Sequence, residues 1–332
     1  MRPLDTRGRR RTRRLLGDRH QRDNTVLAPR SLGGGATMDD RQQLPWQHRK
    51  GWFSEGTVPG ARFGTIEHAF RVDAVVFEGR SKYQEVLIFD HAIYGRVLVL
   101  DGIVQFSSID QAIYHEMLVH PIFASHGQVK DILVIGGGDG GTIRECLRHQ
   151  PRQIVMVDLD PEVITLCRRY LPELSAGAFD DPRVRLVHED GAAYVANSPA
   201  GSFDAVIVDG GDYTGLSEVL FSAPFFADIA RVLRPGGVMS LQTGSVLDAH
   251  LIRDGRERLG ALFADVTAYR LTMPSYHCGE YCFLAAALSS ILSDPDPVRL
   301  SQVEEALRAR FTPAYWSPAV QRAAQVLPAY FP

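Results

Sequence analysis

The segment FDAVIVDGGD, residues 203–212, places two carboxylates at the end of a run that is apolar enough for a buried strand. The two acids are Asp209 and Asp212, three positions apart. In an open α/β sheet, ligands bind at the carboxyl ends of the strands, so this pair marks a candidate site. The structural alternative is a turn held by the side-chain hydrogen bonds that Asp residues often make in loops.

A glycine-rich turn follows another apolar run, in DILVIGGGDGGTIREC from residue 131. Gly136, Gly137 and Gly138 let the backbone turn sharply and come close to a ligand. The helix predicted after the turn would point its first N–H groups towards that ligand. Many nucleotide-binding folds share such a turn, so it indicates a nucleotide or nucleoside without saying which.

Two later strand ends carry acids that suit an adenosine. QIVMVDLD passes through Asp158, at a position where an acid commonly accepts the two ribose hydroxyls. VRLVHED ends in Asp190, followed by Gly191, and a carboxylate there can accept from an adenine amino group. No P-loop Lys-Ser/Thr pair is present, and Asp139 inside the glycine turn would repel a pyrophosphate. The pattern therefore predicts an adenosyl sulfonium cofactor rather than a dinucleotide.

Asp139 also bears on the tail of that cofactor. A methyltransferase that uses intact S-adenosylmethionine must hold the cofactor's carboxylate near this turn, where an acid would oppose it. An acid suits decarboxylated S-adenosylmethionine better, because its tail ends only in an ammonium. The structural alternative is that Asp139 caps the helix beginning at about residue 140.

Strands and helices alternate in the part of the chain that would position these acids. Near-continuous apolar strands separated by helical stretches of about 10–15 residues predict a parallel sheet covered on both faces. The segments 261–271 and 280–288 are expected to close this sheet as a terminal strand pair, and 297–310 and 317–327 are expected to be helices. The predicted strands are 131–137, 153–160, 184–190, 203–210 and 236–243. The fold class is thus α/β, built on a parallel sheet.

A smaller β region precedes that sheet. From about residue 65 to 107, short β-branched runs separated by Gly, Asp or Ser predict a small antiparallel sheet. A helix is expected over 110–124, with Asp110 as its cap. The expected domains are a disordered Arg-rich tail at 1–45, a β domain at 46–110 and the catalytic domain at 111–332.

Charge is unevenly distributed. Residues 1–37 sum to +7 with ten Arg and three Asp, whereas the rest of the chain sums to −10. The basic tail is interpreted as disordered, or as sequence upstream of a start at Met38; a nucleic-acid or targeting arm is the alternative. The acidic body disfavours nucleic acid as a partner and is compatible with cationic substrates.

Four scattered cysteines do not make a disulfide framework, and no run approaches the roughly 20 apolar residues of a membrane span. We therefore expect a cytoplasmic protein with no membrane partner. No metal is expected either, because no cluster of His, Cys and acidic residues has the spacing of metal ligands.

Six motifs between about residues 46 and 288 form a recognisable set. They are GWFSE (51–55), KYQEVLIF (82–89), YGRVLVLDGIVQ (94–105), YHEM (114–117), LVIGGGDGGTIRE (133–145) and PSYHCG (274–279). Together they resemble the polyamine aminopropyltransferase family, the spermidine synthases above all. The resemblance implies a small N-terminal β domain joined to a Rossmann-like, parallel-sheet catalytic domain of the methyltransferase type, assembled as a homodimer or homotetramer. It also implies decarboxylated S-adenosylmethionine as co-substrate, a small amine as acceptor and 5′-methylthioadenosine as a product, with putrescine to spermidine as the expected conversion.

Residue roles follow from the same resemblance. Asp209 falls on the catalytic base, and Tyr114 is the second position implied for catalysis. The positions implied for substrate binding are Asp212, His115, Gln105, Tyr276 and Asp139. The positions implied for cofactor binding are Gln84, Gly136, Gly137, Gly138, Asp158, Asp190, Gly191 and Leu216. Because an alkyl diamine has pKa values near 10 and arrives as a dication, one carboxylate can take its proton while a second anchors the distal ammonium.

The chain departs from the family pattern near the acceptor side. DGGDYTGLSE (209–218) keeps both acids but replaces small polar residues by glycines and two prolines by Tyr213 and Leu216. QFSSIDQAIYHE (105–116) keeps only Asp110 of an acidic-basic run. The acceptor amine is therefore left open. The alternatives are another acceptor amine, a methyltransferase that uses intact S-adenosylmethionine, or a non-catalytic relative that binds a nucleoside or polyamine.

Overall fold

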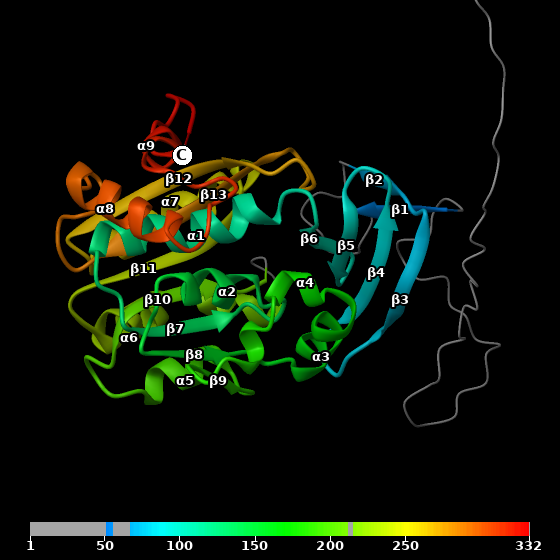
Figure 1. The fold of residues 1–332 in the computed structure, drawn as a ribbon, viewed down its shortest axis with the longest axis horizontal. Helices are drawn as coiled ribbons and strands as arrows, with labels where there is room; N and C mark the ends of the chain where they lie inside the picture. Colours follow the sequence, from blue (N-terminus) through cyan, green and yellow to red (C-terminus); the bar gives the residue numbers. More distant parts are fainter. Residues whose placement is uncertain (1–50, 56–66, 212–214, 332) are drawn as a thin grey trace, which may run out of the picture. The chain divides into compact units, whose positions relative to one another are not determined.

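The computed structural model describes residues 51–55, 67–211 and 215–331, and Figure 1 shows their arrangement. The strands belong to three sheets, of two, four and seven strands. The expected tail at 1–45 lies outside the described residues, and the division of the remainder at residue 110 stays a prediction. In the described ranges, no helix combines the length and apolar character needed to cross a bilayer.

The small N-terminal sheets are antiparallel, as the sequence predicted. One pairs β1 with β2, and the other runs in chain order from β3 to β6. A turn with Asp101 in the left-handed region (φ 48°) and Gly102 joins β5 to β6. The strands are β1 (Trp52–Glu55), β2 (His68–Arg71), β3 (Ala74–Arg80), β4 (Glu85–His91), β5 (Gly95–Leu100) and β6 (Ile103–Ser107).

The seven-stranded sheet has the order β12-β13-β11-β10-β7-β8-β9. Pairs from β11 through β10, β7 and β8 to β9 are parallel, and β13 pairs antiparallel with both β11 and β12. The expected terminal strand pair is confirmed. The strands are β7 (Asp131–Gly136), β8 (Gln153–Val157), β9 (Val184–Val187), β10 (Phe203–Asp209), β11 (Leu233–Ser245), β12 (Asp265–Thr272) and β13 (Glu280–Ala287).

Helices cover both faces of this sheet, which explains why its strands are apolar without alternation. In β7, Ile132 and Val134 face the cluster formed with α1, α2, α8 and α9, while Leu133 and Ile135 face the cluster formed with α5, α6 and α7. The helices are α1 (Gln111–His126), α2 (Gly141–Arg148), α3 (Pro161–Tyr170), α4 (Pro172–Ser175), α5 (Gly191–Asn197), α6 (Ala223–Val232), α7 (Ala249–Gly260), α8 (Pro297–Arg308) and α9 (Pro318–Ala324). The 3₁₀ turns are η1 (Ala178–Asp180), η2 (Gly215–Phe221) and η3 (Val246–Asp248).

The strand order reverses between β7 and β10, and this switch point brings two motifs together. Gly137 N–H donates to the carbonyl oxygen of Asp209 at 2.9 Å. Gly136 has φ +81°, and a Cβ there would collide with that carbonyl. Glycine at 136 therefore lets the tip of β7 lie directly against the tip of β10.

The prediction that Asp110 caps the first long helix is wrong in one respect. Asp110 precedes α1, but its carboxylate makes no capping hydrogen bond. It accepts instead from Ser107 Oγ at 2.7 Å, and from Ser275 N–H and Oγ at 2.7 and 3.0 Å. A long-range partner displaces the local one, because the buried Ser275 N–H needs an acceptor.

Candidate active site

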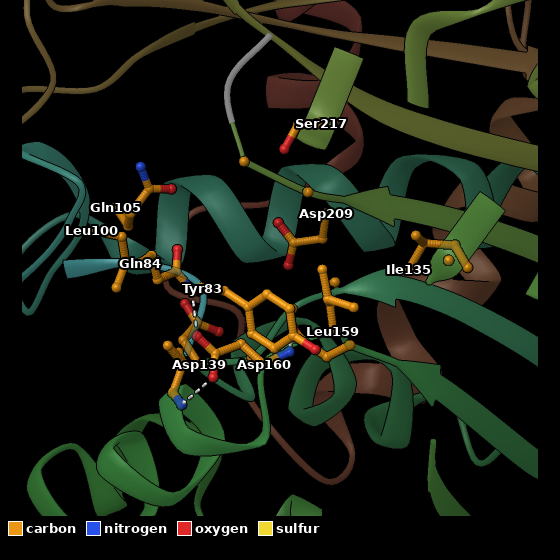
Figure 2. A pocket seen from close by; sticks show the side chains of 18 of the residues that line it. Tyr83, Gln84, Leu100, Gln105, Ile135, Asp139, Leu159, Asp160, Asp209 and Ser217 are labelled. Atoms are coloured by element: carbon orange, nitrogen blue, oxygen red, sulfur yellow. Dashed lines mark hydrogen bonds between the residues drawn. The ribbon is translucent and has the colours of Figure 1, made fainter. Parts of the chain in front are cut away.

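A cavity of about 540 Å³ opens at the switch point, between the tips of the parallel strands and residues of the four-stranded sheet (Figure 2). The described residues that line it include six aspartates and neither Lys nor Arg. The six are Asp101, Asp139, Asp158, Asp160, Asp190 and Asp209. A concave surface of this charge attracts cations and disfavours anions.

Most of the residues expected at the site meet in this cavity. Those lining it are Gln84, Gln105, Tyr114, Gly136, Gly137, Gly138, Asp139, Asp158, Asp190, Gly191 and Asp209. Tyr276 lines a smaller adjoining cavity that shares Gln105 and Tyr114 with the first. Asp212 lies outside the described residues, and Leu216 belongs to η2 without a described side chain.

Asp209 ends β10, and Figure 2 shows its carboxylate within the cavity. Tyr114 Oη donates to Asp209 Oδ1 at 2.8 Å, and Thr142 Oγ1 donates to Asp209 Oδ2 at 2.6 Å. Burial, followed by the nearby Asp139 carboxylate, raises the pKa of Asp209 above its usual value. The carboxylate is thereby oriented by two donors and made more basic than an exposed one.

Tyr114 comes from the first turns of α1 and is buried among aromatic rings. Its ring lies 6.2 Å from that of Tyr276 and 5.0 Å from that of Phe283, centroid to centroid. Burial and then Asp209 raise the pKa of Tyr114 well above 10. The phenol therefore stays protonated and acts as a fixed donor to Asp209.

Asp139 lies in the glycine turn and contacts α1. His115 Nε2 lies 3.2 Å from Asp139 Oδ2, and Gly141 N–H donates to Asp139 Oδ1 at 2.8 Å. Burial of both groups opposes their ionisation, yet their mutual attraction raises the pKa of His115 and lowers that of Asp139. The carboxylate accepts from the first N–H group of α2 and also lines the cavity, but the N-cap residue of α2 is Gly140 and not Asp139.

No His, Cys or acid cluster has metal-ligand spacing in the sequence, but the fold brings three such residues together. One ligand atom each from His115, Asp139 and Asp209 lies within 4.8 Å of the others. The three residues come from α1, the glycine turn and β10, so their distance in sequence hid their proximity. Such a group could hold a small cation, either a metal ion or an ammonium.

The other side of the cavity suits a nucleoside. Asp158 follows β8 and accepts from Asp160 N–H at 2.8 Å. Burial raises its pKa to about 6, with contributions from neighbouring carboxylates. Asp190 caps α5 through Ala193 N–H at 2.8 Å, which leaves its second oxygen for a ligand.

Gln84 reaches this side from the loop before β4. Its side-chain amide donates to Asp160 Oδ2 at 3.0 Å, and Ser81 Oγ donates to the same oxygen at 2.5 Å. The dashed contact between Gln84 and Asp160 is visible in Figure 2. The small sheet and α3 are thus joined at the edge of the cavity.

Sequence reasoning missed several residues around the site. Thr142 holds Asp209, and Gln242 donates from β11 to the carbonyls of Gly210 and Gly211 at 2.9 Å each. Position in the first turn after GGGDGG could have indicated Thr142, since that turn must face the strand tips. No local signal distinguishes Gln242 from other residues of a buried strand.

Comparison with known proteins bears on the family of the chain. Residues 111–290 match the family described as spermine/spermidine synthase domain, and residues 51–108 match the spermidine synthase tetramerisation domain. A polyamine aminopropyltransferase of Escherichia fergusonii is 40% identical over 269 residues, which cover 79% of this chain and 90% of that protein. A polyamine aminopropyltransferase of Salmonella arizonae is 39% identical over 269 residues, with coverage of 79% and 91%.

Solved structures show the same likeness. Spermidine synthase in complex with the transition-state analogue AdoDATO has 30% identity and a TM-score of 0.76, covering 87% of this chain and 95% of its own. Spermidine synthase from Thermotoga maritima has 30% identity and a TM-score of 0.75, covering 88% and 97%. The chain is therefore an enzyme that belongs to the spermine/spermidine synthase family, the polyamine aminopropyltransferases.

Proposed function

We propose that this enzyme transfers the aminopropyl group of decarboxylated S-adenosylmethionine to a di- or polyamine, converting putrescine to spermidine and releasing 5′-methylthioadenosine. The observation that carries the proposal is the set of six aspartates, without Lys or Arg, among the described residues lining the cavity. The co-substrate carries a sulfonium and an ammonium, and the acceptor carries two ammonium groups. All four charges match this lining, whereas the carboxylate of intact S-adenosylmethionine would oppose Asp139.

In this proposal the co-substrate spans the cavity from Asp190 to Asp139. Asp190 and Gly191 receive the adenine, Asp158 accepts from the ribose hydroxyls, and the glycines at 136–138 admit the chain close to the backbone. Asp139 holds the ammonium end, and Gln84 borders the nucleoside side. Support comes from the lining of one continuous cavity by these residues and from the AdoDATO complex of the similar spermidine synthase.

Asp209 is proposed as the base. It takes a proton from the acceptor ammonium, and the freed nitrogen lone pair attacks the aminopropyl carbon that is bonded to sulfur. A C–N bond forms as the C–S bond breaks, and the C–S electron pair returns to sulfur as the neutral thioether of 5′-methylthioadenosine. The product is a secondary ammonium, and the proton on Asp209 passes to solvent. Tyr114 and Thr142 support this role by fixing both oxygens of the carboxylate.

The acceptor is proposed to lie between the main cavity and its smaller neighbour, where Tyr276 Oη donates to the carbonyl oxygen of Gln105 at 2.8 Å. Asp212 is proposed to anchor the distal ammonium, and Leu216 to border the cofactor. His115 is proposed to act in substrate binding through Asp139, which holds the ammonium end of the co-substrate. The match of residues 51–108 to a tetramerisation domain supports assembly as a homodimer or homotetramer.

Ligand binding measured by calorimetry tests the proposal. We expect 5′-methylthioadenosine and decarboxylated S-adenosylmethionine to bind, and intact S-adenosylmethionine to bind at least tenfold more weakly than its decarboxylated form. Asp139→Asn should narrow that difference, because it removes the charge that repels the carboxylate. Tighter binding of intact S-adenosylmethionine to the unaltered enzyme would favour a methyltransferase and overturn the proposal.

A further inference from the structure

A second large cavity, of about 570 Å³, lies at the opposite end of the seven-stranded sheet from the active site. Its walls come from the C-terminal ends of α1 and α2 and from α8. In Figure 1, α8 lies beside the end of α1 that is farthest from β6. No residue named so far in the active site lines this second cavity.

The lining of this cavity is the electrostatic opposite of the active site. Among the described residues around it are three arginines, two histidines and two glutamines, and no carboxylate. The arginines are Arg148, Arg299 and Arg310, and we refer to the space between them as the basic cavity. Convergence of like charges around a hollow costs electrostatic free energy unless a counter-ion occupies it.

The three guanidinium groups differ in how far they are already engaged. Arg148 Nε lies 2.7 Å from Glu145 Oε2, and its guanidinium lies over the ring of Phe311. Arg299 Nη1 donates to the carbonyl oxygen of Ser125 at 2.8 Å, which uses one of its five donors. Within the described ranges, neither Arg299 nor Arg310 forms an ion pair, so most of their donors remain for a ligand.

The two histidines respond to the same surroundings. Burial, and after it His120 and Arg148, hold the pKa of His149 well below its usual value, although Glu145 opposes them. Burial and then Arg299 lower the pKa of His126, although Asp204 opposes them. Both rings are therefore neutral at pH 7 and can donate or accept a hydrogen bond without adding to the positive charge.

We propose that the basic cavity is a second ligand site, which binds a phosphate-bearing anion. Guanidinium groups match phosphate oxygens in geometry and charge, and the two glutamines and two histidines add neutral donors. The volume is in the range of small-molecule sites, about 300–1,000 Å³, and suffices for inorganic phosphate, pyrophosphate or a nucleoside phosphate. Since the active site is lined by aspartates, the same anion is excluded there.

The basic cavity lies far from the reaction site along α1. His126 is at the far end of the helix that carries Tyr114, about 18 Å along its axis at 1.5 Å per residue. A phosphate held between α1, α2 and α8 would tie the three helices together. We therefore expect the ligand to bind alongside the active-site ligands rather than in competition with them.

Calorimetric titration of the full chain with sodium phosphate, sodium pyrophosphate and ATP, at constant ionic strength set by sodium chloride, tests the proposal. We expect saturable binding of at least one of them, unchanged when 5′-methylthioadenosine fills the active site. Arg310→Gln should weaken binding at least tenfold, and Arg299→Gln with Arg310→Gln should weaken it further. Arg322→Gln is the matched control: it removes the same charge from an exposed position of α9, away from the cavity.

Comparison of the affinities for phosphate and ATP distinguishes a site for free phosphate from a site for a nucleotide. Equal affinity for phosphate and ATP would identify a free phosphate site, whereas a preference for ATP would identify a nucleotide site. Absence of saturable binding, an equal loss in Arg322→Gln, or displacement by 5′-methylthioadenosine would each overturn the proposal. Binding of long RNA alone, with steep salt dependence, would overturn it too. Because Arg299 also holds Ser125, the single variant Arg310→Gln keeps the test valid if the double variant does not fold.

Discussion

At the scale of single residues, the account depends most on Asp209. Asp209→Asn should lower kcat by about 10²- to 10⁴-fold, because the amide cannot take the acceptor's proton. The thermal midpoint should change little, since an amide oxygen can still accept from Tyr114 or Thr142. Asp73→Asn is the matched control, because Asp73 is exposed and is not among the residues that line the cavity. Steady-state kinetics on both variants decide the matter, and equal activity in the two would contradict the proposed base.

The ionisation of Asp158 in the cavity makes the stability of the fold depend on pH. Burial raises its pKa to about 6, so the folded state holds a proton that the unfolded state loses near pH 4. Stability is therefore lost as pH rises between about 4 and 6, and the ionised carboxylate costs about 1–3 kcal/mol at pH 7.

Asp158→Asn should accordingly raise the thermal midpoint of the ligand-free enzyme at pH 7 and leave it nearly unchanged at pH 4. The same variant should bind 5′-methylthioadenosine more weakly, because a charged acceptor for the ribose is gone. Thermal melts at the two pH values measure the first effect and calorimetry the second. A variant that is less stable at pH 7 would show that ionised Asp158 stabilises the fold.

The sequence could predict the position of a site residue where adjacent residues in the chain determine that position. Asp158 and Asp190 could be placed because each follows an apolar strand, and the structure brings both into one cavity. The grouping of His115, Asp139 and Asp209 could not be predicted from spacing, because it depends on the packing of α1 against the glycine turn. The roles of these residues remain predictions.

At the scale of elements, Asp110 joins the start of α1 to the stretch that carries Tyr276. Asp110→Ala should destabilise the fold by about 2–3 kcal/mol, because it leaves the buried Ser275 N–H without its acceptor. It should also raise KM for the amine through displacement of Tyr276. Asp296→Ala, which removes an exposed cap from α8, should cost about 1 kcal/mol and leave KM unchanged. Denaturant unfolding and amine titrations measure these effects, and an unchanged KM in Asp110→Ala would refute the link.

Element types were predictable where the pattern was strong. The apolar strands and the glycine turn specified the parallel sheet, and the terminal antiparallel pair was found within a few residues at each end. The function of Asp110 was not predictable from local sequence, because a helix cap and a long-range clamp use the same residue at the same position. Only the approach of Ser275, 165 residues later, decides between them.

At the scale of the whole molecule, the basic segment 1–37 and the acidic remainder are expected to act independently. A chain that begins at Met38 should keep kcat/KM for the amine within about twofold, since every described residue of the site follows it. Kinetics of the two chains side by side test this, with light scattering to compare their oligomeric state. A loss of tenfold or more would assign the segment a part in catalysis or assembly.

The measurement that tests the central claim most directly is turnover followed by mass spectrometry. The enzyme is offered decarboxylated or intact S-adenosylmethionine with putrescine, cadaverine, agmatine or spermidine in separate reactions. We predict 5′-methylthioadenosine together with an aminopropylated amine, formed from the decarboxylated co-substrate, with spermidine made from putrescine. S-adenosylhomocysteine with a methylated amine, or no product from any pair, would contradict the account.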